Sequence, residues 1–227
     1  PERGDAVNIY HTFDTNIATE IRLREALDKD LVVPFHYYGV SDVKGLDYQE
    51  TDLTDIAKLA KLLQTHRRVE YIVQQMQFYD FDGDKLKCLG FCVNIEHAQY
   101  MAEQFNCIGI NAVALTGTDS ESVRQQMMHD IQDDAHELQV IFTVDIFNEG
   151  VDIPSINLVL MLRPTQSPII FLQQLGRGLR HFPDKAFLTV LDFIGNHERS
   201  FMIAIALYGK RIIDKDSLKV AVNNDFQ

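Results

Sequence analysis

The sequence has no tryptophan, only three cysteines and no long apolar run. Cys88 and Cys92 lie in one apolar segment and Cys107 lies apart from them, and the histidines are dispersed, so no Cys/His cluster forms a metal signature. We therefore expect no metal site and buried thiols in a reducing, cytoplasmic setting, with a zinc site or a disulfide as the less favoured alternatives. A membrane-spanning helix needs about 20 apolar residues, so we expect no membrane contact.

Positive charge is scarce as well. The chain has 21 Lys and Arg against 33 Asp and Glu, a net charge of −12, which excludes a protein that coats nucleic acid electrostatically. The stretch 155–183 nevertheless contains no acidic residue, while Arg163, Arg177, Arg180 and His181 lie in it. Such a stretch indicates either a local anion site or a buried strand and helix that carry few charges of any kind.

Apolar residues make up 46% of the chain and charged residues 24%, the balance of a globular domain. Short β-rich runs alternate with helical stripes, which predicts a mostly parallel sheet flanked by helices, an α/β fold. The expected strands cover residues 32–38, 86–93, 111–115, 138–144, 156–162 and 186–193. The expected helices lie around 17–27, 56–63, 69–76, 94–105, 118–131, 168–179 and 196–207.

Several residues predict how these elements begin and where ligands bind. Pro34 favours an edge position for the first strand, because proline cannot donate to a sheet ladder. Asn94 is expected to cap one helix, Thr118 with Glu121 another, and Ser167 with Pro168 a third. Ligands of such sheets bind beyond the carboxyl ends of the strands, which here means the loops after residues 93, 115, 144 and 162.

The sharpest chemical feature is the run from Gln173 to Arg180, which has the pattern Q-x-x-G-R-x-x-R. Arg177 and Arg180 are three residues apart, so on a helix they share one face, and two guanidinium groups suit the charge of a phosphoryl group in transfer. Gly176 and Gly178 each cost a helix about 1 kcal/mol, which is explained if a ligand or backbone approaches closely. The alternative is a surface helix end, where arginine is favoured by the helix dipole.

A second feature is the segment 143–154. It leaves a buried strand at Thr143 and turns through Gly150 and Asp152 to Pro154. An ordinary turn, in which Asp, Gly and Pro are common, is the alternative interpretation.

Taken together and in this order, these segments resemble four motifs of the second RecA-like domain of superfamily 2 helicases and translocases. Residues 173–180 resemble motif VI, residues 143–154 resemble motif V, and residues 88–98 resemble motif IV with its helix. Residues 115–117 resemble the short motif between them. The resemblance covers most of residues 85–195 and implies a three-layer RecA-like (P-loop NTPase-like) domain.

The resemblance also implies roles. Arg177 and Arg180 are expected to reach the phosphates of ATP, with Gln173 coupling that contact to the domain interface. Gly150, Asp152 and Gly176 are expected to lie at the nucleotide. The predicted nucleic-acid contacts are Asn94, Thr116, Gly117 and Thr143, although Thr143 stands one residue before the position that often binds phosphate.

The sequence contains neither a G-x-x-x-x-G-K-[ST] loop nor a D-E-x-[DH] box; Asp133 to His136 is expected on a helix without a preceding Walker strand. ATP and Mg²⁺ are therefore expected to be held mainly by an N-terminal RecA-like domain of the same protein. Pro1 to Arg3 resembles the residues that follow such a domain, so residues 1–50 are expected to connect it and pack on the sheet edge, and residues 51–227 to form the C-terminal domain. We expect a further domain to follow.

Two segments indicate which branch of the superfamily 2 helicases the sequence resembles most. Residues 149–154 resemble the form found in restriction-enzyme-type and repair-type helicases, and residues 189–196 are similar to a subgroup of large bacterial helicase-like proteins. The favoured function is the C-terminal motor domain of an ATP-dependent DNA or RNA helicase. The alternatives are a RecA-like interaction module without motor activity and, less favoured, a nucleotide-binding enzyme of Rossmann type.

Overall fold

The computed structural model describes residues 23–43, 55–144, 153–163 and 175–194. These residues form a sheet of six strands, in the order β1-β6-β5-β2-β4-β3, and every strand pairing is parallel. The strands are β1 (Phe35–Ser41), β2 (Cys88–Phe91), β3 (Ala112–Leu115), β4 (Val140–Thr143), β5 (Leu158–Met161) and β6 (Leu188–Ile194). The predicted parallel α/β sheet is confirmed, although most strands are shorter than expected.

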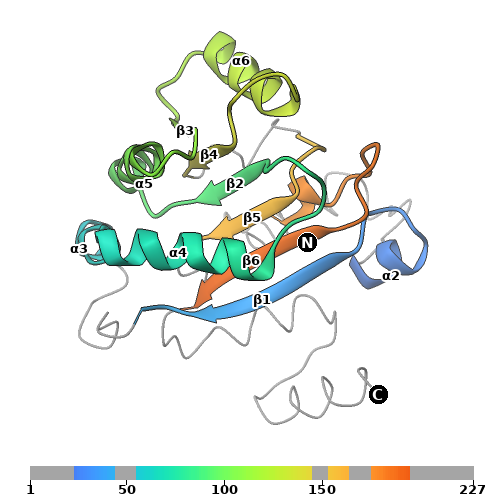
Figure 1. Cartoon of the computed structure of the whole chain (residues 1–227), viewed down its shortest axis with the longest axis horizontal. Helices are drawn as coiled ribbons and strands as arrows, with labels where there is room; N and C mark the ends of the chain where they lie inside the picture. The colour runs from blue at the N-terminus through green and yellow to red at the C-terminus, as the bar shows by residue number, and fades with distance from the viewer. Residues whose placement is uncertain (1–22, 44–54, 145–152, 164–174, 195–227) are drawn as a thin grey trace, which may run out of the picture.

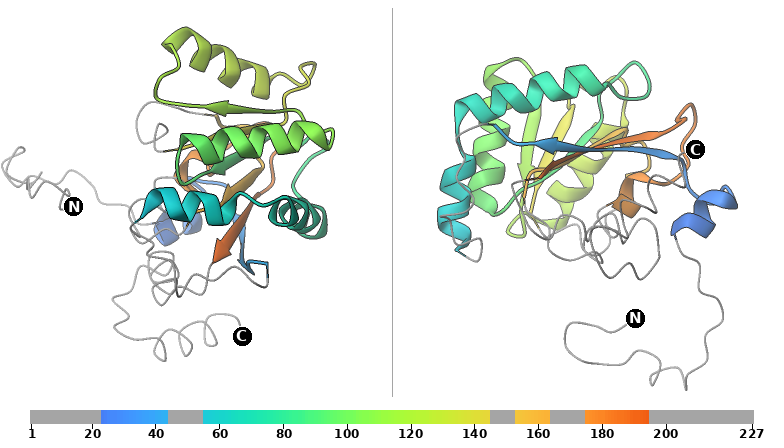
Figure 2. Two further views of the ribbon diagram at one scale, coloured as in Figure 1. Left: turned by 90° about the vertical axis from the view of Figure 1, so that its left-hand side faces the viewer. Right: turned by 90° about the horizontal axis from the view of Figure 1, so that it is seen from below.

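Helices cover both faces of this sheet (Figures 1 and 2). The α-helices are α2 (Leu23–Asp28), α3 (Ile56–Leu63), α4 (His66–Tyr79), α5 (Ile95–Cys107) and α6 (Glu121–Gln132), and residues 175–178 are also helical. In the right-hand view of Figure 2 the sheet lies between α4 and the short orange helix near residue 178. The three layers are those of the expected fold.

The apolar side chains of each strand alternate between two cores. Val140 and Phe142 point toward the core beneath α4 and α5, whereas Ile141 points toward the core beneath α6 and the helical residues 175–178. Leu158 and Leu160 alternate with Val159 and Met161 in the same way. Strands that are buried on both faces need apolar residues at every position, which explains the continuous apolar runs of the sequence.

The first strand lies at the edge of the sheet, as Pro34 predicted. All seven residues of β1 pair with β6, from Phe35 opposite Leu188 to Ser41 opposite Ile194. Residues 32–34 were expected in the strand but precede it: Val33 donates its N–H to Leu179 O at 2.8 Å, and proline has no N–H to donate. The division at residue 50 stays a prediction, and residues 17–22 of the expected first helix lie outside the described part.

The helix predictions hold in part. Asn94 caps α5, and all four residues of its predicted stripe, from Ala98 to Phe105, are buried. The cap of α6 was wrong: Ser120, not Thr118, accepts the N–H of Val123, because the chain from Thr116 to Asp119 forms its own turn. Residues 133–136 follow α6 as a turn and not as helix. The expected Ser167–Pro168 helix start and the helix at 196–207 lie outside the described residues.

Candidate functional site

The predicted nucleic-acid residues lie at one end of three neighbouring strands. In the register of the sheet, Thr143 at the end of β4 stands between Phe91 of β2 and Leu115 of β3. Asn94 follows β2 and Thr116 follows β3, so the parallel topology places these three residues at the same carboxyl edge. The residues brought together in this way are Asn94, Thr116, Gly117 and Thr143.

Most polar atoms of this group have partners within the chain. The side-chain oxygen of Asn94 accepts the N–H of His97 at 2.8 Å, and the hydroxyl of Thr116 donates to Asp119 at 2.9 Å. Gly117 is exposed, whereas the side chain of Thr143 is completely buried. Exposed backbone at Gly117 is thus the most accessible part of the group, and a contact of these residues with nucleic acid stays a prediction.

The motif VI arginines lie elsewhere. Residues 175–178 are helical, with Leu175 buried in the core and Gly176 exposed. The N–H of Val33, just before β1, donates to Leu179 O, so this segment ends near the amino end of the sheet. The structure therefore does not bring the arginines to the carboxyl edge that holds Asn94 and Thr116.

The two arginines do not share a helix in the way that their spacing predicted. The helical residues end at Gly178, and Arg180 lies on the bend that follows. Leu179 O accepts the N–H of Val33, and Pro183, four residues further on, has no N–H with which to continue the helix. As whole residues, Arg177 is half-buried and Arg180 is exposed. Gln173, Gly150 and Asp152 lie outside the described residues.

The two glycines of this segment differ in their surroundings. A Cβ added to Gly178 would lie 2.8 and 2.9 Å from the methyl groups of Leu188 on β6, whereas a Cβ on Gly176 would meet nothing within 4 Å. Close packing on β6 therefore explains why residue 178 is a glycine. Gly176 has no such explanation in the described part of the chain, which leaves the close approach of a ligand as its predicted reason.

This contrast makes a prediction. Gly178→Ala is expected to lower the free energy of unfolding by about 1–3 kcal/mol, because Leu188 is buried and cannot move aside. Gly176→Ala is expected to raise it by up to about 1 kcal/mol, the helix propensity of alanine over glycine. Urea denaturation of both variants measures the difference. Equal effects of the two changes would contradict the packing explanation.

A buried ion pair that sequence reasoning missed lies at the carboxyl edge, on the α4 side. Arg68 on α4 donates its Nε to both oxygens of Asp42, at 3.1 and 2.9 Å, and its Nη2 to Leu162 O at 3.4 Å. The two side chains are 1% and 3% exposed. Arg68 precedes Ile72 and Met76 at spacings of four, so its place on the buried stripe of α4 was the available signal.

Other buried polar groups surround this pair. His97 accepts the N–H of Val93 through Nδ1, and burial together with Arg68 lowers its pKa to about 3. Burial raises the pKa of the Cys92 thiol above its usual range, although the charges of Arg68 and Arg163 act against this. A neutral imidazole and a neutral thiol near these arginines indicate a structural cluster and not a nucleophile.

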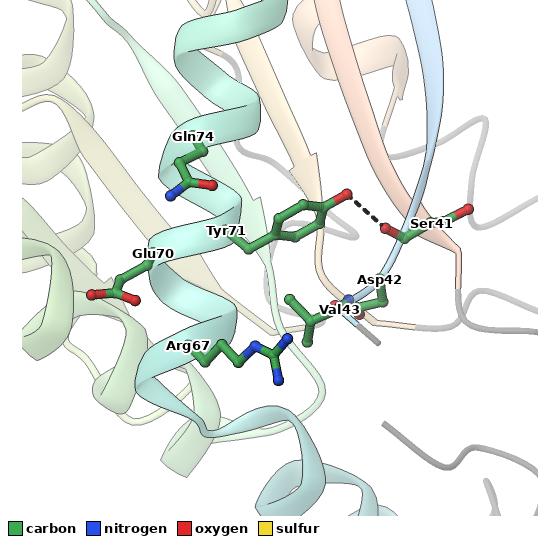
Figure 3. A pocket seen from close by; sticks show the side chains of 7 residues that line it. All are labelled: Ser41, Asp42, Val43, Arg67, Glu70, Tyr71 and Gln74. Carbon is green, nitrogen blue, oxygen red and sulfur yellow. Dashed lines mark hydrogen bonds between the residues drawn. The ribbon is translucent and has the colours of Figure 1, made fainter. Parts of the chain in front are cut away.

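A surface pocket of about 510 Å³ lies beside this cluster (Figure 3). Tyr71 on α4 donates its hydroxyl to Ser41 O at 2.9 Å across the pocket. The residues that line the pocket are Ser41, Asp42, Val43, Arg67, Glu70, Tyr71 and Gln74. Among the described residues, none of the predicted site residues lines this pocket.

Two kinds of site are absent from the described residues. No group of three His, Cys, Asp or Glu side chains in these residues could hold a metal ion. The helices among them are also too short or too polar to cross a membrane.

Comparison with known proteins identifies the domain type. Residues 58–182 match the family model described as the helicase conserved C-terminal domain. A Saccharomyces cerevisiae protein named as an ATP-dependent helicase, IRC3, is 30% identical over 175 residues, which are 77% of this chain and 24% of that protein. A Schizosaccharomyces pombe relative, named as a mitochondrial ATP-dependent helicase, is 31% identical over 145 residues, which are 64% of this chain and 23% of that protein. The chain thus spans about a quarter of the length of these relatives.

Solved structures share the fold. The HsdR fragment of a type I restriction enzyme from Vibrio vulnificus superposes with a TM-score of 0.68 and 22% identity, covering 85% of this chain and 38% of that chain. The Type ISP restriction-modification enzyme LlaBIII, solved bound to DNA, has a TM-score of 0.61 and 15% identity, covering 89% of this chain and 16% of that chain. Identities this low show the fold alone, which is the RecA-like fold that the motifs predicted.

Proposed function

The chain belongs to the helicase conserved C-terminal domain family, and we propose that it is the second half of an ATP-driven motor that moves along DNA or RNA. The observation that carries this proposal is the position of Arg177 and Arg180. Both lie in a stretch without acidic residues, and as residues Arg177 is half-buried and Arg180 is exposed. Two arginines near one another in the chain suit the phosphates of a nucleotide held by another domain.

In this proposal the nucleotide lies between two domains. An N-terminal RecA-like domain of the same protein holds most of ATP and Mg²⁺, since this sequence has no Walker boxes. Arg177 and Arg180 supply positive charge to the phosphates, and Gln173 couples that contact to the domain interface. Gly150, Asp152 and Gly176 border the nucleotide. The term complete motor is used below for this chain together with the N-terminal RecA-like domain that carries the Walker boxes.

The carboxyl edge supplies the proposed nucleic-acid contact. Exposed backbone at Gly117, together with Asn94, Thr116 and the strand end at Thr143, faces the phosphate backbone. Contacts of this kind need no basic surface, which agrees with the net charge of −12. Backbone contacts also carry little base information, so the proposal covers both DNA and RNA.

The test is ATP hydrolysis with and without nucleic acid. The isolated 227-residue chain is expected to hydrolyse ATP no faster than a buffer control, because it has no phosphate-binding loop. The complete motor is expected to hydrolyse ATP, faster when single strands are added. If the two domains of the complete motor associate but nucleic acid does not stimulate ATP hydrolysis, the result would instead favour a RecA-like interaction module.

A further inference from the structure

A lysine outside every predicted motif joins two of them. Lys185 donates its Nζ to Pro154 O at 2.8 Å and to Gly178 O at 2.6 Å. Pro154 ends the segment that resembles motif V, and Gly178 lies inside the one that resembles motif VI. One ammonium group therefore holds the ends of two motifs that lie far apart in the sequence.

A tight turn presents this lysine. The N–H of Lys185 donates to Phe182 O at 3.1 Å, Pro183 stands second in the turn, and Asp184 stands third with a φ of 62°. Proline at the second position and a left-handed residue at the third are typical of a type II turn. The Lys185 side chain has little conformational freedom, because the turn fixes its backbone and the two carbonyls bind its ammonium group.

The Lys185 side chain is partly buried. Burial lowers the pKa of Lys185 to about 8, while the carboxylate of Asp82 acts in the opposite direction. Asp82 itself is held in place, because it accepts the N–H of Ala186 at 2.5 Å. Removing an ammonium group from water is costly unless it gains partners, and the two carbonyls supply them.

The bond to Gly178 O acts on the arginines through the backbone. The last carbonyls of a helix have no partner within it, so the chain leaves the helix in a direction set by other contacts. Lys185 binds the carbonyl of Gly178, which directly follows Arg177, and Val33 binds the next carbonyl, which directly precedes Arg180. These two bonds hold the carbonyls of both residues that lie between the arginines.

We propose that Lys185 is a positioning residue for Arg177 and Arg180, which it anchors to the end of motif V. The inference rests on the proposed function, since it assumes that the arginines act on ATP phosphates. A displacement of about 1 Å at a catalytic group can lower a rate about 100-fold, so a loose anchor is expected to reduce turnover more than binding.

Lys87 provides a matched control for mere stability. It is a more deeply buried lysine that also binds a helix end, since its Nζ donates to Gln132 O at 2.9 Å at the end of α6 and pairs with Asp134 at 2.6 Å. It touches neither motif V nor motif VI in the described residues. Both Lys87→Met and Lys185→Met remove a bond from an ammonium group to a carbonyl at a helix end, and Lys87→Met also removes an ion pair with Asp134, but only Lys185 bonds carbonyls within the two motif segments.

The experiment measures kcat and KM for ATP in the complete motor with saturating single-stranded nucleic acid. Lys185→Met is expected to lower kcat about 10- to 100-fold with a smaller change in KM, and Lys185→Arg, which still offers several N–H donors, to restore much of it. Lys87→Met is expected to keep near wild-type kcat. If Lys185→Met lowers the folded fraction, Lys185→Gln replaces it in the comparison with Lys87→Met, because glutamine keeps an N–H donor.

A double variant separates this inference from the proposed function. If Lys185 acts through Arg177, adding Lys185→Met to Arg177→Ala is expected to lower kcat little further. Normal kcat in Lys185→Met and Lys185→Gln, beside a strong loss in Arg177→Ala, would overturn the inference and leave the proposed function intact. Equal losses in Lys87→Met and Lys185→Met would also overturn it. Normal kcat in both Arg177→Ala and Arg180→Ala would overturn the arginine roles in the proposed function.

Discussion

Replacing Arg177 or Arg180 by alanine is expected to lower the kcat of the complete motor for ATP hydrolysis about 10³-fold, the scale of an arginine finger. The loss is expected mainly in kcat, because a charge contact to the phosphates strengthens as the phosphoryl group departs. Steady-state hydrolysis with saturating nucleic acid measures it. Because Arg180 lies on the bend beyond Gly178, the two positions are to be tested separately.

Two comparisons make this result specific. Arg177→Lys is expected to restore little activity, since lysine offers a point charge where arginine offers a planar fork. Arg67→Ala is the matched control, because Arg67 is an exposed arginine on α4. This helix packs on the face of the sheet opposite to the helical residues 175–178. Nucleic-acid affinity without nucleotide is expected to change little in all of these variants. Normal stimulated hydrolysis in both alanine variants would return this segment to an ordinary helix end.

Replacing Arg68 by methionine is expected to lower the free energy of unfolding by about 3–5 kcal/mol. The change removes the guanidinium group that binds both oxygens of the Asp42 carboxylate, whose side chain is 3% exposed. It also removes the contact from α4 to Leu162 O at the end of β5. Chemical denaturation of the isolated chain, followed by circular dichroism, measures the loss.

The same chain offers the control for this prediction. Arg67→Met removes the same charge and similar volume one residue earlier, on the exposed side of α4, and is expected to change stability by less than about 0.5 kcal/mol. The pair Arg68→Met with Asp42→Leu is expected to recover most of the loss, because no buried charge then remains. A small effect of Arg68→Met alone would mean that water reaches Asp42.

Local sequence patterns were sufficient to predict the layers of the fold and to locate the motifs. The spacing of Ala98, Met101 and Phe105 predicted the buried face of α5, and Asn94 its cap, because both depend on neighbours within one or two turns. The pattern of residues 173–180 predicted the domain type that the family comparison shows. The contacts of Gly176, Arg177 and Arg180 with a nucleotide were predicted from that pattern and stay predictions.

The sequence by itself determined the parallel α/β architecture and the helicase domain type, since periodicity and motif order are properties of the chain alone. Only the tertiary structure decided that Arg68 pairs with Asp42, that Gly178 packs on Leu188, and that Lys185 joins the ends of two motifs. Each of these contacts joins separate elements whose meeting depends on the strand order β1-β6-β5-β2-β4-β3. No local preference of a lysine or an arginine encodes which distant carbonyl or carboxylate the folded sheet will place beside it.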